Sequence, residues 1–67
     1  MKIPDELLKR WNDLKSFGDG KKIAEENPEI TDMDVSRAFN KGECSDKVFE
    51  AIAQFYKLKE EKIKEYL

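Results

Sequence analysis

The apolar residues of this chain recur at helical spacing along most of its length, and no other feature constrains the fold as strongly. The first apolar stripe consists of Ile3, Leu7, Trp11 and Leu14, which follow one another at intervals of four, four and three residues. No stretch alternates apolar and polar residues for long enough to indicate a strand. We therefore expect an all-α protein, with a single small domain spanning residues 1–67.

Glycine and proline set the expected limits of the first two helices. The first helix should begin near Pro4 and end at Phe17, because the glycine that follows Phe17 can take the left-handed conformation after a helix end. Asp19 should then cap a short second helix over residues 20–27. Pro28 should end that helix, since proline disfavours helical geometry in the residue before it.

Two hydroxyl residues mark the starts of the third and fourth helices. Thr31 and Asp34 have the spacing of a capping box, in which each side chain bonds the backbone amide of the other residue. This box should open a helix over residues 31–41. After a short loop, Ser45 should cap a long C-terminal helix over about residues 46–66.

Each expected helix carries one apolar face, so the four helices can share one core. The architecture that suits four helices, two of them short, is a compact four-helix orthogonal bundle. Its inner faces should be formed by Trp11 with the rest of its stripe, Ile23, Ala24, Val35, Ala38, Phe39, Val48, Ile52, Phe55 and Tyr56.

The residue types that are missing exclude the common catalytic and metal-binding groups. The sequence has no histidine and one cysteine, Cys44, so it offers no histidine base, no disulfide pair and no thiolate metal cluster. Glu25 and Glu26 are adjacent, and neighbours on a helix point about 100° apart, which does not suit an acid–base pair. We expect a protein that is not an enzyme and needs no cofactor or metal.

Charge and hydropathy indicate a protein without membrane contact. Charged residues make up 42% of the chain, and the net charge is −2. No apolar run approaches the roughly 18 residues of a membrane helix. The first five residues, Met1 to Asp5, turn charged at once, which does not fit a signal peptide. We therefore expect a cytoplasmic protein.

One stretch of the chain, residues 22–42, has a distinctive order of residue types. An apolar residue followed by alanine, Ile23-Ala24, comes first, and Ile30 follows as the apolar residue of the turn. Thr31 then opens the next helix, which contains the pair Val35-Ser36 and closes with Asn40-Lys41-Gly42. This order resembles the helix-turn-helix of lambda-repressor-like (Xre/Cro-type) DNA-binding domains, here over about residues 20–41. The run from Val35 to Asn40 also looks like the recognition helix of lactose-repressor-type regulators.

The resemblance implies sequence-specific binding of double-stranded DNA by a small bacterial or phage transcriptional regulator, associated with the nucleoid. Helix 31–41 would then enter the major groove. Five residues on its outer face would contact base edges: Asp32, Met33, Ser36, Arg37 and Asn40. Four residues would contact phosphates: Lys21, Lys22, Thr31 and Lys41.

The same stretch departs from the family pattern in its turn and in its charge. The turn is one residue longer than is usual, and Pro28 stands where glycine is common. Residues 23–34 contain five acidic and no basic side chains, a charge that opposes a phosphate backbone. The alternative function is therefore a helical protein–protein interaction module that keeps the helix-turn-helix shape without binding DNA.

The C-terminal helix offers an apolar edge that suits a second copy of the chain. The residues expected in such a homodimer are Phe55, Leu58, Ile63, Tyr66 and Leu67. A dimer would match a two-fold operator whose half-sites lie ~34 Å apart. The alternative is a partly frayed, solvated helix end stabilised by charge pairs at i,i+4 spacing.

Overall fold

Four helices account for nearly all of the regular structure in the computed structural model, which describes residues 1–65. They are α1 (Asp5–Leu14), α2 (Asp19–Glu26), α3 (Asp32–Lys41) and α4 (Asp46–Glu65). Within the described residues no strand forms, and a single antiparallel bridge joins Lys2 to Glu43. The prediction of an all-α four-helix domain is confirmed.

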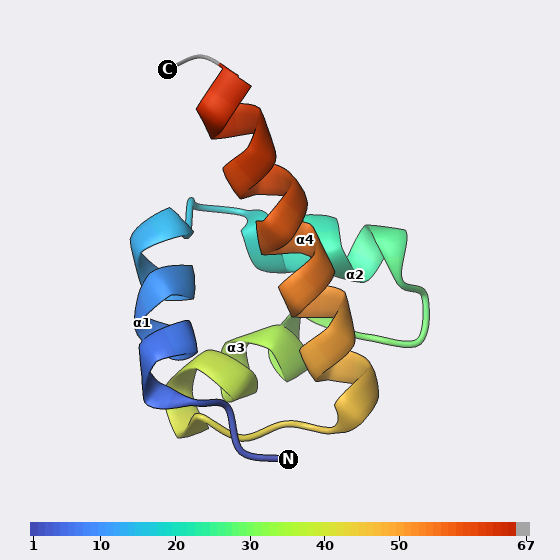
Figure 1. Ribbon diagram of the computed structural model, residues 1–67. Coiled ribbons are helices and arrows are strands. Elements are labelled where there is room, and N and C mark those ends of the chain that lie inside the picture. Colours follow the sequence, from blue (N-terminus) through green and yellow to red (C-terminus); the bar gives the residue numbers. More distant parts are fainter. Residues whose placement is uncertain (66–67) are drawn as a thin grey trace.

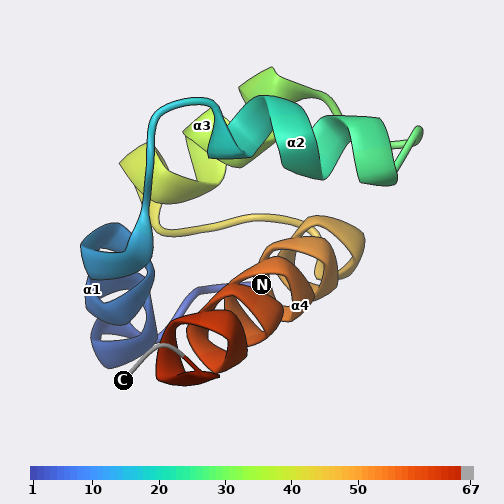
Figure 2. The same cartoon turned by 90° about the horizontal axis from the view of Figure 1, so that it is seen from above.

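The long helix α4 organises the molecule, because each of the other three helices contacts it. α2 and α3 pack against each other and lie together on one side of α4, as Figure 2 shows. α1 packs beside α4 and lies to its left in both views (Figures 1 and 2). The last turns of α4 extend past the ends of the other helices (Figure 1).

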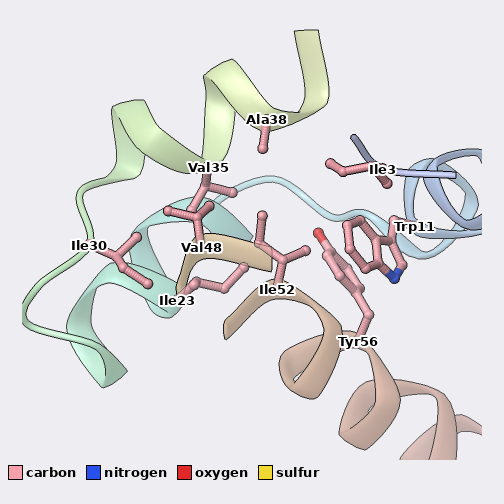
Figure 3. Close-up of a cluster of buried hydrophobic side chains, with 9 residues drawn as sticks. All are labelled: Ile3, Trp11, Ile23, Ile30, Val35, Ala38, Val48, Ile52 and Tyr56. Carbon is pink, nitrogen blue, oxygen red and sulfur yellow. The ribbon is translucent and has the colours of Figure 1, made fainter. Parts of the chain in front are cut away.

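One contiguous cluster of nine buried residues forms the core (Figure 3). Every helix contributes to it, as do the N-terminal segment and the turn before α3: Ile3, Trp11, Ile23, Ile30, Val35, Ala38, Val48, Ile52 and Tyr56. Trp11 stacks on Tyr56 with 6.1 Å between the ring centroids, so the aromatic rings join α1 to α4. Fully burying such side chains stabilises a fold by about 1.5–3 kcal/mol each. The expected core positions are buried or half-buried, as predicted.

The capping box at the start of α3 is present as predicted. The Thr31 hydroxyl accepts a hydrogen bond from the Asp34 amide at 3.2 Å, and the Asp34 carboxylate accepts one from the Thr31 amide at 3.1 Å. Gly42 ends the helix in the left-handed conformation, with φ of 70°. Ser45 accepts a hydrogen bond from the Val48 amide at 3.4 Å at the start of α4. Both ends of α3 are therefore fixed by local chemistry.

The expected boundary between the first two helices is wrong. α1 ends at Leu14 rather than Phe17, because Lys15 already has extended backbone with ψ of 132°. Gly18, with φ of 88°, directly precedes α2 instead of closing α1. Asp19 does not cap α2 from outside: it is the first helical residue, and its side chain points into the protein.

The N-terminal segment is held against the loop between α3 and α4. The Ile3 amide donates to the Gly42 carbonyl at 2.8 Å, and the Cys44 amide donates to the Met1 carbonyl at 3.0 Å. The side chain of Ile3 is also buried in the core. This pairing ties the loop that follows α3 to the N-terminal segment.

Candidate nucleic-acid interface

The outer face of α3 is formed by the residues that the core leaves free. Val35 and Ala38 are fully buried on its inner face. The five residues predicted to contact base edges are all exposed: Asp32, Met33, Ser36, Arg37 and Asn40. Met33, with 61% of its surface exposed, is the large apolar group among them. We call these five residues the α3 outer face.

The polar groups of the α3 outer face are not engaged within the part of the chain that the structure describes. The side chains of Ser36, Arg37 and Asn40 form no hydrogen bond to other described residues, and Arg37 and Asp32 form no ion pair with them. These groups are solvated on the isolated chain. Their donors and acceptors are available to a partner.

The predicted phosphate contacts divide into two locations. Arg37 and Lys41, one turn apart on α3, line a shallow hollow together with Asp34 and Glu43. Lys22 lies elsewhere, in a groove between α2 and the C-terminal half of α4. Lys21 and Thr31 are exposed. The structure thus brings Arg37 and Lys41 together and separates Lys22 from them.

Thr31 keeps a free proton although its oxygen serves the capping box. The hydroxyl oxygen accepts from the Asp34 amide. A threonine hydroxyl has one donor besides its acceptor lone pairs, so this bond leaves the donor available. A phosphate at the start of α3 would also meet the partial positive charge of the helix N-terminus.

The acidic side chains of residues 23–34 differ in their surroundings. Asp34 is half-buried and bonded to the Thr31 amide, and Glu29 pairs with Lys47 at 3.1 Å. Glu25, Glu26 and Asp32 are exposed and have no ion pair among the described residues. Asp32 therefore leaves negative charge at the N-terminal end of the α3 outer face, whereas Glu26 lines the groove between α2 and α4.

A buried polar cluster at the start of α2, which the sequence did not predict, lies apart from the α3 outer face. Asp19 is 2% exposed and accepts hydrogen bonds from the Ser16 amide at 2.8 Å, from Lys59 Nζ at 2.8 Å and from the Tyr56 hydroxyl at 3.2 Å. Lys59 also donates to the Ser16 hydroxyl. We call these four residues the Asp19 cluster. They join α4 to the start of α2, about forty residues apart in the sequence. No local sequence pattern indicates a contact between residues so far apart.

Hydrogen bonding sets the ionisation of this cluster. Burial by itself raises the pKa of Asp19, but the bonds from Lys59, Ser16 and Tyr56 outweigh it and hold the pKa below its ordinary value. Burial, followed by the charge of Asp19, raises the pKa of the Tyr56 hydroxyl. The cluster is therefore an ionised carboxylate surrounded by hydrogen-bond donors. Each of its polar groups is paired, which is typical of structural polar groups.

The residues expected in a homodimer occupy different surfaces. Phe55 is half-buried and Leu58 is 52% exposed, and both line the groove between α2 and α4. Ile63 is 42% exposed and does not line that groove. Tyr66 and Leu67 lie outside the described residues. Phe17, which was expected to end the first helix, lies in the loop between α1 and α2 and is fully exposed.

Other kinds of site have little support in the described part of the chain. No group of three or more histidine, cysteine, aspartate or glutamate side chains is arranged to hold a metal ion. Burial raises the pKa of the Cys44 thiol, which lowers its reactivity. Among residues 1–65 no helix combines the length and the apolar character needed to cross a membrane.

Comparison of the chain with protein-family models, with curated proteins and with solved structures finds no match.

Proposed function

We propose that this protein binds double-stranded DNA in a sequence-specific manner and acts as a small transcriptional regulator of the helix-turn-helix type. One observation carries the proposal: the α3 outer face presents unengaged hydrogen-bonding side chains on a helix whose other face is locked into the core. In this arrangement α2 packs against α3 and supports it, and α3 is the recognition helix.

The side chains of the α3 outer face suit the edges of base pairs. The major groove is about 12 Å wide and admits an α-helix. Arg37 can donate two hydrogen bonds to guanine, Asn40 can pair with adenine, and Met33 can contact a thymine methyl group. Asp32 can accept a hydrogen bond from the amino group of cytosine. In that position its negative charge would recognise a base and would not face a phosphate.

Contacts at both ends of α3 support this face. The capping box orders the first turn of α3, and Gly42 with the N-terminal segment orders the last turn. A preorganised helix loses less conformational entropy on binding than a flexible one. Lys41, one turn after Arg37, would fix position by contacting a phosphate.

A second candidate function is a protein-interaction module, and the exposed carboxylates favour it. Glu25, Glu26 and Asp32 repel a phosphate backbone but attract a basic partner protein. The two functions differ in what they require of Arg37, since a basic partner gains nothing from an arginine on this face.

Selection from a pool of randomised duplexes tests the proposal. The salt concentration should be low, about 50 mM, because phosphate contacts weaken steeply with salt. Arg37→Ala is selected in parallel. Its matched control is Lys57→Ala, which removes the same charge from an exposed position on α4.

The proposal predicts an enriched motif for the wild type and for Lys57→Ala. For Arg37→Ala it predicts a loss of about 1–3 kcal/mol confined to one base position. Failure of the folded wild-type protein to enrich any motif would reject sequence-specific DNA binding. An equal loss of affinity in both variants would show only a nonspecific effect of charge, and would reject reading by Arg37.

A further inference from the structure

A groove runs between α2 and the C-terminal half of α4, with a volume of about 640 Å³. Its apolar part is formed by Phe55 and Leu58 of α4. Ser16 and Asp19 form one end, where the Asp19 cluster closes the groove. The groove is separate from the α3 outer face, because none of the five residues of that face lines it.

An exposed aromatic side chain lies next to this groove. Phe17 follows Ser16 in the loop between α1 and α2, and its ring is fully exposed. Exposed phenylalanine is costly in water, since a fully buried side chain of this size gains about 1.5–3 kcal/mol. Gly18, in the left-handed conformation, holds the loop in the shape that projects Phe17 from the surface.

The rim of the groove carries unpaired charges of both signs. Lys22 and Glu26 lie on the α2 side, and Glu61, Lys62 and Glu65 lie on the α4 side. None of these five forms an ion pair with another described residue. A polyanion or an anionic membrane would meet three carboxylates here. A partner that brings both signs is complementary, and a second copy of the same rim does so.

The last described turn of α4 projects beyond the other described helices. The helix extends past α1 and α2, and residues 61–65 are all exposed (Figure 1). α3 packs nearer the opposite, N-terminal end of α4 (Figure 1). Contact between copies through the C-terminal half of α4 therefore leaves the α3 outer face of each copy uncovered.

We propose that the groove between α2 and α4 is the interface with a second copy of this chain, in which Phe17 of each copy enters the groove of the other. A two-fold interface requires a self-complementary surface, so that each residue meets the same neighbour in both directions. Phe17 supplies the protruding group, Phe55 and Leu58 supply the receiving surface, and the mixed charges of the rim pair between copies. The inference does not depend on DNA binding.

Sedimentation over a range of protein concentrations, about 5–500 μM, tests this interface without DNA, because interfaces of this kind reach micromolar affinity. Two variants remove the proposed anchor and its receiving surface: Phe17→Ser and Leu58→Ser. The matched control is Met33→Ser, which removes a similarly exposed apolar side chain from the α3 outer face. Since Phe17 is fully exposed and does not belong to the core, its variant should fold like the wild type, and circular dichroism checks this.

The expected result is a reversible dimer of the wild type and of Met33→Ser. In Phe17→Ser and Leu58→Ser the dissociation constant should rise by about tenfold or more. A wild type that stays monomeric at the highest concentration would overturn the proposal and leave the groove to a different partner. A dimer that both groove variants retain would also overturn it, because the copies would then meet elsewhere.

Discussion

The Asp19 cluster and the α3 outer face both consist of polar and charged side chains, yet they have opposite surroundings. In the cluster a carboxylate that is 2% exposed is bonded to Lys59, Tyr56 and the Ser16 amide. On the α3 outer face the side chains of Ser36, Arg37 and Asn40 are exposed and form no hydrogen bond to other described residues. The cluster joins two helices, whereas the face is left free by them.

This difference separates the residues that stabilise the fold from those available for binding. A buried polar group is tolerated only when it is paired, so the loss of its partner lowers the stability of the fold. An exposed polar group is already solvated, so its loss has little effect on stability. Substitutions in the two regions should therefore change different measurable quantities.

The largest expected effect on stability is that of Asp19→Ala. It leaves the buried Tyr56 hydroxyl without an acceptor and Lys59 without its ion pair. Because Lys59 is partly exposed and can reach water, we expect a loss of about 2–3 kcal/mol, below the range for fully buried pairs. Urea unfolding followed by Trp11 fluorescence measures it.

Asp32→Ala is the matched control, since Asp32 is also an aspartate in the first turn of a helix but is exposed. Its free energy of unfolding should stay within about 0.5 kcal/mol of the wild type. Equal losses in the two variants would mean that Asp19 acts only through the helix dipole and not through its cluster.

The stability that Asp19 contributes should also depend on pH. Its pKa in the folded protein is lowered, relative to an unfolded value of about 3.9. The contribution is then complete above the unfolded pKa and is lost as the pH falls through the folded pKa. The difference in unfolding free energy between the wild type and Asp19→Asn should be constant near neutral pH and should shrink below about pH 4. A difference that grows in acid would contradict the lowered pKa.

A smaller effect is expected from Thr31→Ala at the start of α3. The substitution removes the hydroxyl that accepts from the Asp34 amide, and loss of such a cap costs about 1 kcal/mol. Thr31→Ser keeps the hydroxyl and should remain close to the wild type. If both variants lose the same stability, the packing of the threonine methyl group, and not the cap, is responsible.

Local chemistry accounts for the parts of the fold that the sequence predicts. The limits of α3 follow from a capping box and a glycine, signals that act within one turn of the helix. The core positions follow from the spacing of apolar residues, and Trp11, Ile52 and Tyr56 are buried as that spacing requires. The free residues of α3 then follow by elimination, because a helix with one buried face exposes the other.

Tertiary contacts account for what the sequence does not predict. Asp19 looks like a helix cap in the sequence, but Tyr56 and Lys59 draw its side chain inward from a helix about forty residues away. α1 ends early because Lys15 turns into the extended segment that carries the chain to α2. Phe17 consequently lies in a loop, where its apolar character no longer indicates a buried position.

DNA should contact the α3 outer face and no other surface of the protein. Amide chemical shifts of the ¹⁵N-labelled protein, followed during titration with a duplex enriched by selection, test it most directly. We expect shifts concentrated at Met33, Ser36, Arg37 and Asn40, with the residues around the groove between α2 and α4 unchanged. Shifts confined to that groove, or an unchanged α3 at saturating duplex, would contradict it.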